Sequence, residues 1–243
     1  MRNPAFASIE EAFLYCRDMD ASLSERLETF SNVARTLRPA MQEAVDRMVE
    51  RLRTSNAGDG APKPGDAMPP FILPDETGRF VSLQELLAVG PVAITFHRGH
   101  WWPYCRINTR ALSEAQERIR EEGAQIVAIM PERQQFAAAF KSDAALLYPV
   151  LTDIDNGYAL SLNLAIWVGA ELQHLMASSG RDLPSYQGNE GWFLPIPATF
   201  VLASDGTVTA RFIDPDYRKR MTIEDMLAAL KSAQIPGESD RKP

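Results

Sequence analysis

Cys105 is the residue whose type and position most directly suggest chemistry. It lies nine residues after a β-branched run, Val92–Phe96, inside the segment HRGHWWPYCR that ends at Arg106. In an open α/β sheet, ligands and reactive groups gather where strands end and helices begin. A cysteine in the first turn of the following helix meets free N–H groups and the positive end of the helix dipole, which favour the thiolate. Cys105 is therefore a candidate nucleophile, with Arg98 and Arg106 as nearby positive charges; the alternative is a buried cysteine that packs as a small hydrophobe.

The elements that must position Cys105 follow from the hydrophobic pattern. Residues 92–96 and 125–130 predict buried strands, and residues 104–122 and 132–141 predict helices. This strand–helix–strand–helix order indicates a parallel α/β core. Further along the chain the pattern predicts a strand at 148–151, a helix at 156–164, an irregular insertion at 169–193, strands at 199–202 and 207–213, and a helix at 222–233.

The chain divides into four parts by composition. Residues 1–53 form a helical N-terminal extension with apolar residues at three- and four-residue steps. Residues 54–65 form a linker rich in Ser, Asn, Gly, Asp and Pro. Residues 66–235 form the α/β domain, and residues 236–243 form a disordered tail. The extension either docks within the chain or serves as the arm of a homodimer.

Charge and hydropathy exclude several classes of function. The net charge of −7 and the pI near 5.1 disfavour nucleic-acid binding, and the short basic run Arg218-Lys219-Arg220 is interpreted as a solvated turn. No apolar run reaches the ~18 residues needed to span a bilayer. The N-terminus lacks the pattern of a secretory signal, so we expect a cytoplasmic protein. There is no glycine-rich phosphate loop, and no cofactor is expected.

Four segments resemble one known family, the peroxiredoxin-like branch of the alkyl hydroperoxide reductase and thiol-specific antioxidant superfamily. They are residues 65–71, 96–105, 196–202 and 214–217, so the resemblance covers about residues 66–233. It implies a thioredoxin-like three-layer α/β/α sandwich. It also implies a thiol peroxidase without cofactor, whose catalytic residues would be Cys105, Arg98, Trp102 and Pro197.

The chain departs from this family at two positions. Trp102 stands where the branch often carries a first cysteine, and where typical peroxiredoxins carry a Thr or Ser that holds the peroxide. Trp102 offers an indole N–H but no hydroxyl. Pro197 stands where peroxiredoxins keep an arginine and resembles the thioredoxin-fold proline, usually cis, which would leave an edge for an extended partner. Arg98 could supply the missing guanidinium or could pair with a surface carboxylate.

The remaining candidates surround the thiol or could act on it. His100, Trp101, Tyr104 and Thr199 are expected to line the substrate pocket, where the aromatic residues either form an apolar wall or simply pack. Cys16 could resolve a sulfenic acid at Cys105, but we favour a half-buried structural thiol, since its helix must dock to bring the sulfurs together. The histidines and cysteines lack ligand spacing, so no metal site is predicted.

Two functions follow from these observations. The first is a one-cysteine peroxidase that reduces hydrogen peroxide or organic hydroperoxides and is recycled by thioredoxin or a low-molecular-weight thiol. The second is a thioredoxin-fold binding or redox-regulatory module that has lost catalysis, in which Trp102 and Pro197 mark a protein-docking surface.

Overall fold

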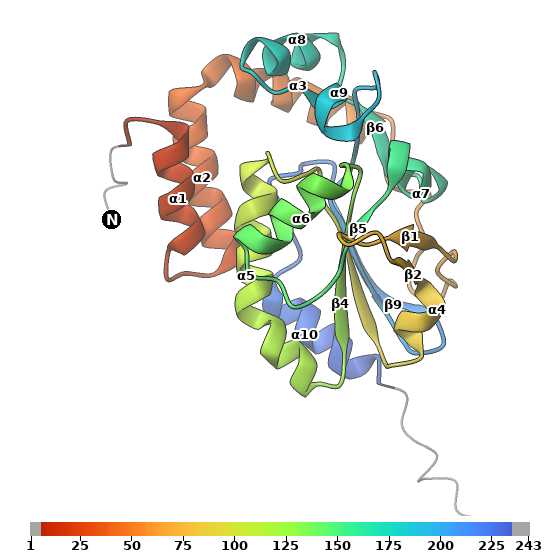
Figure 1. Ribbon diagram of the computed structural model, residues 1–243. Helices are drawn as coiled ribbons and strands as arrows, with labels where there is room; N and C mark the ends of the chain where they lie inside the picture. The colour runs from red at the N-terminus through yellow and green to blue at the C-terminus, as the bar shows by residue number, and fades with distance from the viewer. Residues whose placement is uncertain (1–5, 235–243) are drawn as a thin grey trace, which may run out of the picture.

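The centre of the structure, a computed structural model that describes residues 6–234, is a five-stranded sheet with the order β5-β4-β3-β8-β9 (Figure 1). Strands β3, β4 and β5 run parallel, and β8 runs antiparallel to both β3 and β9. The strands are β3 (Val92–Phe96), β4 (Gln125–Met130), β5 (Val150–Thr152), β8 (Ala198–Leu202) and β9 (Val208–Ile213). All the residues of β3, β5 and β8 are buried, as expected for strands that are covered on both faces.

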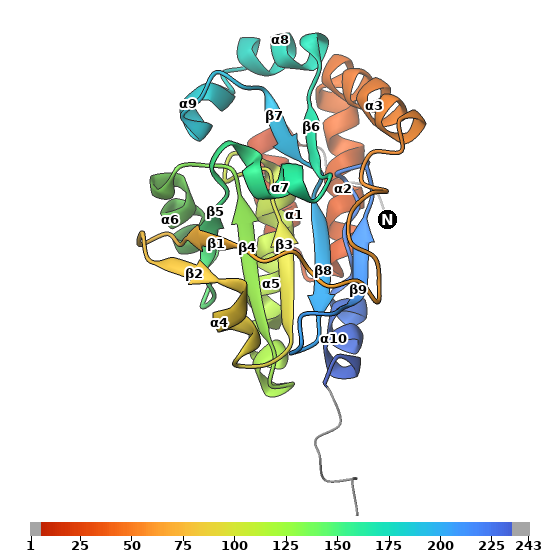
Figure 2. The same cartoon turned by 90° about the vertical axis from the view of Figure 1, so that its right-hand side faces the viewer.

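Layers of other elements cover the two faces of this sheet. Helices α5 and α10 lie on one face, and the β1–β2 hairpin, α4 and α7 lie on the other (Figure 2). Helix α6 packs beside β5. These elements are α5 (Pro103–Glu121), α10 (Ile223–Ser232), β1 (Ile72–Pro74), β2 (Phe80–Ser82), α4 (Leu83–Leu87), α7 (Gly157–Ser161) and α6 (Gln134–Asp143). The expected thioredoxin-like α/β/α architecture is confirmed.

The N-terminal extension consists of α1 (Ile9–Asp18), α2 (Leu23–Leu37) and α3 (Pro39–Thr54), of which α1 and α2 lie along the outer side of α5 (Figure 1). Ser22 and Glu25 form a reciprocal capping box that starts α2. Arg26 of α2 reaches Glu114 of α5 at 2.8 Å. The extension is thus docked on the helix that begins beside Cys105. After α3, Arg211 of β9 donates to the carbonyl oxygen of Ala61, which holds the segment predicted as a linker against the sheet.

The region predicted as an irregular insertion is in fact structured. It follows β6 (Ala165–Trp167) and contains α8 (Ala170–Ser178), α9 (Leu183–Gln187) and β7 (Phe193–Pro195), with β6 and β7 paired antiparallel. The helix predicted for 156–164 is shorter in the structure: α7 spans only Gly157–Ser161, and a 3₁₀ turn (Ile154–Asn156) precedes it. Asp182 caps α9 and Gly188 ends it in the left-handed conformation (φ 78°), so its boundaries are encoded locally. The apolar runs of β6 and β7 are too short to predict as strands.

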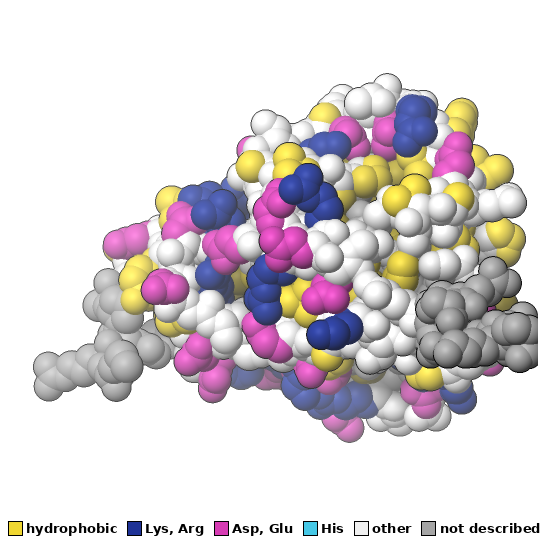
Figure 3. Space-filling view, turned by 90° about the horizontal axis from the view of Figure 1, so that it is seen from below, with side chains coloured by type: hydrophobic (Ala, Val, Ile, Leu, Met, Phe, Trp, Pro, Cys, Tyr) yellow, Lys and Arg dark blue, Asp and Glu magenta, His cyan; other side chains and the backbone are white. Residues whose placement is uncertain are grey.

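The surface carries charges of both signs. Seen from below, acidic and basic side chains are interspersed (Figure 3). Among residues 6–234 no helix is long and apolar enough to cross a membrane. The disordered tail predicted for 236–243 lies outside the described residues, as does the very N-terminus on which the expectation about a secretory signal rested.

Candidate functional site

Cys105 occupies the first turn of α5, directly after the loop that leaves the carboxyl end of β3. Trp102 is the N-cap residue without a side-chain cap, and Pro103 takes the first helical position, where its missing N–H is no loss. The Cys105 side chain has no exposed surface. The backbone N–H of Arg98 donates to Cys105 Sγ at 3.3 Å. The loop therefore folds back on the helix start and presents a donor to the sulfur.

A guanidinium group from a distant part of the chain also reaches the sulfur. Arg220 Nη2 lies 3.9 Å from Cys105 Sγ, and the whole residue is only 8% exposed. Burial lowers the pKa of Arg220, while the adjacent sulfur favours its charged form. The interpretation of residues 218–220 as a solvated turn was wrong for Arg220. This residue lies in the loop between β9 and α10, and its charge is turned inward.

Arg98 contacts the site with its backbone more directly than with its side chain. Its Nε donates to the carbonyl oxygen of Pro195 at 3.3 Å, and its guanidinium lies 4.4 Å from the centre of the Tyr217 ring. Burial lowers the pKa of Arg98 to about 10, so the group stays charged at neutral pH. Arg106, the other cation considered near the thiol, lies over Phe13 of α1 at 4.2 Å and 3.8 Å from Asp143.

Tyr217 is the centre of an aromatic cluster beside the thiol. Its ring centroid lies 5.1 Å from Trp102 and 5.2 Å from Tyr104. Tyr104 in turn packs edge-on against Phe30 of α2, with centroids 5.0 Å apart. Among the described residues, several buried donors of this neighbourhood have no hydrogen-bond acceptor, including Arg98 Nη2, Trp102 Nε1, Tyr217 OH and Arg220 Nε. A site lined by donors without acceptors favours a ligand that brings oxygen lone pairs or negative charge.

The loop before Cys105 is fixed by a buried carboxylate. Glu132 accepts hydrogen bonds from the backbone N–H of His100 and contacts His100 Nδ1, both at 2.7 Å. Burial raises the pKa of Glu132, although its contacts with His100 oppose the shift. Gly99 has a φ of 143°, and a Cβ there would lie 2.6 Å from the Glu132 side chain. The tight approach of loop and carboxylate therefore requires glycine at this position.

The structured insertion covers this loop from outside. Tyr186 of α9 stacks with Trp101, with centroids 6.0 Å apart, and meets His100 edge-on at 5.3 Å. Arg181 lies 5.9 Å from the ring centre of Trp102. His100 and Trp101, both expected in the substrate pocket, are thus half-buried against the insertion.

Thr199 and Pro197 lie in or beside the central strand β8. Thr199 is buried and pairs with Thr95 across the sheet. Pro197 is buried between β7 and β8, and the described peptide bonds are all trans. The peptide bond before Pro197 is therefore trans, unlike that of the cis proline with which it was compared, and β8, which follows it, is hydrogen-bonded on both sides.

Among the described residues, neither Cys16 nor any histidine forms a hydrogen bond with the Cys105 sulfur, which is contacted by Arg98 and Arg220. Cys16 on α1 is fully buried, both cysteines are free, and burial raises the pKa of Cys16 to about 11. His97 is fully buried with its Nε2 3.0 Å from Thr95 Oγ1, and burial lowers its pKa to about 3. His174 belongs to α8. Within residues 6–234 no three His, Cys, Asp or Glu side chains gather as a metal site.

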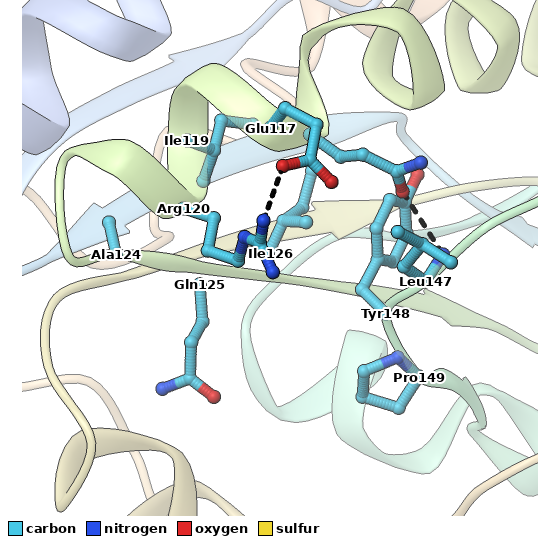
Figure 4. A pocket seen from close by; sticks show the side chains of 10 residues that line it. Glu117, Ile119, Arg120, Ala124, Gln125, Ile126, Leu147, Tyr148 and Pro149 are labelled. Carbon is cyan, nitrogen blue, oxygen red and sulfur yellow. Dashed lines mark hydrogen bonds and ion pairs between the residues drawn. The ribbon is translucent and has the colours of Figure 1, made fainter.

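A pocket of about 180 Å³ lies at the opposite end of the sheet (Figure 4). It is formed by the end of α5, the start of β4 and residues 147–149. Gln116 Oε1 accepts from the backbone N–H of Leu147 at 3.0 Å on its rim. Since Cys105 lies at the start of α5, this pocket is separate from the candidate site.

Comparisons with known proteins agree with this geometry. A chloroplastic peroxiredoxin Q of Sedum lineare is 30% identical over 92 residues, which are 38% of this chain and 49% of the relative. The match thus spans about half the length of that curated relative. The crystal structure of peroxidoxin BcpB from Mycobacterium tuberculosis is 24% identical, covers 70% of this chain and 97% of its own, and has a TM-score of 0.53. A peroxiredoxin-like protein from Aquifex aeolicus is 15% identical over 70% of this chain and 87% of its own, with a TM-score of 0.53.

These structural likenesses show the fold, and the family follows from the sequence. The model of the AhpC/TSA family matches residues 64–211, a span that contains β3, Cys105 and β8 and exceeds half of the chain. This protein belongs to the AhpC/TSA family.

Proposed function

We propose that this protein is a thiol peroxidase in which Cys105 attacks the O–O bond of a hydroperoxide. One observation carries the proposal: Cys105 Sγ lies at the N-terminus of α5 within reach of the Arg98 N–H (3.3 Å) and Arg220 Nη2 (3.9 Å). A helix N-terminus and a cation both stabilise a thiolate, which is the nucleophilic form. Membership of the AhpC/TSA family supports this chemistry.

The reaction balances with the groups present and the peroxide. The Cys105 thiolate attacks the terminal oxygen of ROOH, so that an S–O bond forms and the O–O bond breaks. The sulfur becomes a sulfenic acid, and the leaving RO⁻ takes a proton from solvent to give ROH. Arg220 and the unpaired donors of Arg98 and Trp102 are placed to stabilise negative charge that develops on the oxygens. In this proposal the indole N–H of Trp102 takes the place of the hydroxyl donor that the sequence lacks.

An external thiol restores the enzyme in this proposal. The thiol attacks the sulfenic sulfur to give a mixed disulfide and water, and a second thiol releases the Cys105 thiolate and a disulfide. Cys16 is fully buried with a pKa raised to about 11, which keeps it in the unreactive thiol form at neutral pH. These facts favour thioredoxin or a low-molecular-weight thiol over Cys16 as the reductant.

A peroxide assay with chemical trapping tests the proposal. Hydrogen peroxide and an organic hydroperoxide are supplied to the protein with dithiothreitol, and the loss of peroxide is compared with that of Cys105→Ser. A dimedone-type reagent is added in a parallel single-turnover reaction and the labelled residue is identified by mass spectrometry. We expect turnover that depends on Cys105 and a label on Cys105. Peroxide loss equal to that of Cys105→Ser would overturn the proposal and would favour the binding-module alternative.

A further inference from the structure

A chain of four charged side chains links the N-terminal helices to the loop that carries Arg220. Asp46 of α3 binds Arg35 of α2 through one oxygen (2.9 Å) and Arg218 through the other (2.7 Å). Arg218 also forms two hydrogen bonds to Asp216, at 2.6 and 2.9 Å. The loop between β9 and α10 is therefore tied to both α2 and α3 at a point two residues from Arg220.

The same loop supplies Arg220, whose guanidinium reaches the thiol, and Tyr217, whose ring packs against Trp102 and Tyr104. Tyr217 directly precedes Arg218, and Lys219 separates Arg218 from the inward-facing Arg220. The carbonyl oxygen of Tyr217 accepts a hydrogen bond from Arg220 Nη1, and the Arg98 guanidinium lies over the Tyr217 ring. A shift of Arg218 therefore moves the backbone from which Arg220 reaches Cys105.

The link is screened from solvent more than other ion pairs on α3. In the pair that joins α3 to the loop, the side chains of Arg218 and Asp46 are 14% and 40% exposed. The pair between Arg47 and Glu171, which joins the same helix to α8, is 58% and 55% exposed. Exposed pairs contribute little, whereas Arg218 is also held within its own loop by the bidentate and largely buried contact with Asp216. The two pairs provide a test and a matched control on one helix.

We propose that Asp46 is a positioning residue that holds Arg220 against Cys105 through Arg218. The N-terminal extension is then part of the reactive site's machinery, although none of its described residues forms a hydrogen bond with the sulfur. This inference rests on the proposed role of Cys105 as a nucleophile, but its test measures the thiol itself and does not require peroxide turnover.

The positioning role and a direct electrostatic effect of Asp46 predict opposite changes in the reactivity of Cys105. Asp46→Asn removes a negative charge, and the loss of its repulsion alone would favour the thiolate and speed its reactions. If Asp46 acts by positioning, the released Arg218 lets Arg220 move away, and the thiolate loses its nearest cation. The reaction of Cys105 then becomes slower at neutral pH.

The experiment measures alkylation of Cys105 by iodoacetamide from pH 5 to 10, in a Cys16→Ser background so that only one thiol reacts. The plateau at high pH reports access to the thiol, and the midpoint reports stabilisation of the thiolate. For Asp46→Asn we expect a midpoint shifted to higher pH and a rate at pH 7, relative to the plateau, lowered by about threefold. Asp46→Glu keeps the carboxylate and should restore the midpoint. Arg47→Gln is the control on the same helix and should leave the profile unchanged.

Arg218→Lys provides a second route if Asp46→Asn does not fold. It keeps the positive charge but loses the bidentate grip on Asp216, and we expect the same upward shift. An unchanged or lower midpoint in the folded variants would overturn the positioning role. A shifted midpoint in a protein without peroxide turnover would uphold the positioning role and overturn only the peroxidase.

Discussion

Arg220 Nη2 lies 3.9 Å from Cys105 Sγ, although 115 residues separate the two in the chain. The guanidinium does not come from the position of Pro197, just before β8, but from the loop after β9. Two buried cations, Arg98 and Arg220, are thus close to the start of α5, where the Cys105 sulfur and the carboxylate of Asp216 both favour their charged forms. Because a buried cation is costly without a counter-charge, this arrangement favours a ligand that brings negative charge to the site.

Replacement of Arg220 by Gln should slow the reaction of Cys105 with peroxide. The amide removes the positive charge but retains a donor, and an opposite charge at this range typically changes the ionised fraction at neutral pH by about tenfold or more. The measurement is the second-order rate of Cys105 oxidation by hydrogen peroxide at pH 7. Lys219→Gln is the matched control, since Lys219 is 57% exposed and faces Asp214 at 3.2 Å. Equal losses in the two variants would show that Arg220 acts only through the general charge of the loop.

Replacement of Cys16 by Ser should leave steady-state peroxide turnover with dithiothreitol within about twofold of wild type. The Cys16 thiol is buried, and its raised pKa of about 11 keeps it protonated at pH 7, so it attacks a sulfenic acid slowly. Non-reducing mass spectrometry after one equivalent of peroxide provides a second measurement. A stoichiometric disulfide between Cys16 and Cys105 would contradict this expectation and would identify Cys16 as the resolving cysteine.

The sequence pattern predicted the core around Cys105 because that core depends on local periodicity. The β-branched run Val92–Phe96 is buried on both faces, and the helix after it starts at Pro103 within one residue of the expected position. A helical N-terminal extension was also expected, and Ser22 and Pro39 mark the starts of α2 and α3 by capping and by position. In each case the signal lies within a few residues of the element that it determines.

The parts of the site that depend on distant contacts could not be predicted. Arg220 is one of three consecutive basic residues, and only the tertiary structure turns it inward while Lys219 remains outside. Glu132 begins a polar stretch that resembles a helix start, and its contact with His100 arises because β3 and β4 are neighbours in the sheet. Tyr217 belongs to a segment, residues 214–217, that resembles a block of the family. The resemblance did not show that its ring packs beside Trp102 and Arg98.

Replacement of Glu132 by Ala should lower the free energy of unfolding by about 2–3 kcal/mol, because it leaves the backbone N–H of His100 without an acceptor and opens a cavity beside Gly99. Chemical denaturation at pH 7 measures this loss. Glu171→Ala is the control: its ion pair with Arg47 is more than half exposed, and its removal should leave the free energy of unfolding nearly unchanged. Similar losses in both variants would contradict the view that Glu132 anchors the loop.

His97 should make the protein less stable as the pH falls below neutrality. Burial, with a smaller contribution from the charge of Arg220, lowers the pKa of His97 from 6.5 to about 3 in the folded protein. Below about pH 6.5 the unfolded chain therefore binds a proton that the folded chain does not. The stabilisation is present above pH 6.5 and is lost as the pH falls towards 3, with a slope of at most about 1.4 kcal/mol per pH unit.

The variant His97→Gln isolates this effect from the carboxylates, which also titrate in acid. Glutamine keeps a polar group near Thr95 Oγ1 but does not titrate, so the wild type should lose stability relative to the variant between pH 7 and pH 5. Both proteins are unfolded with urea at each half unit of pH, and the difference between their free energies of unfolding is plotted. A difference that stays constant across this range would contradict the prediction. If burial keeps the imidazole of His97 neutral in the folded protein, the difference between the two free energies of unfolding must change as the unfolded chain takes up its proton.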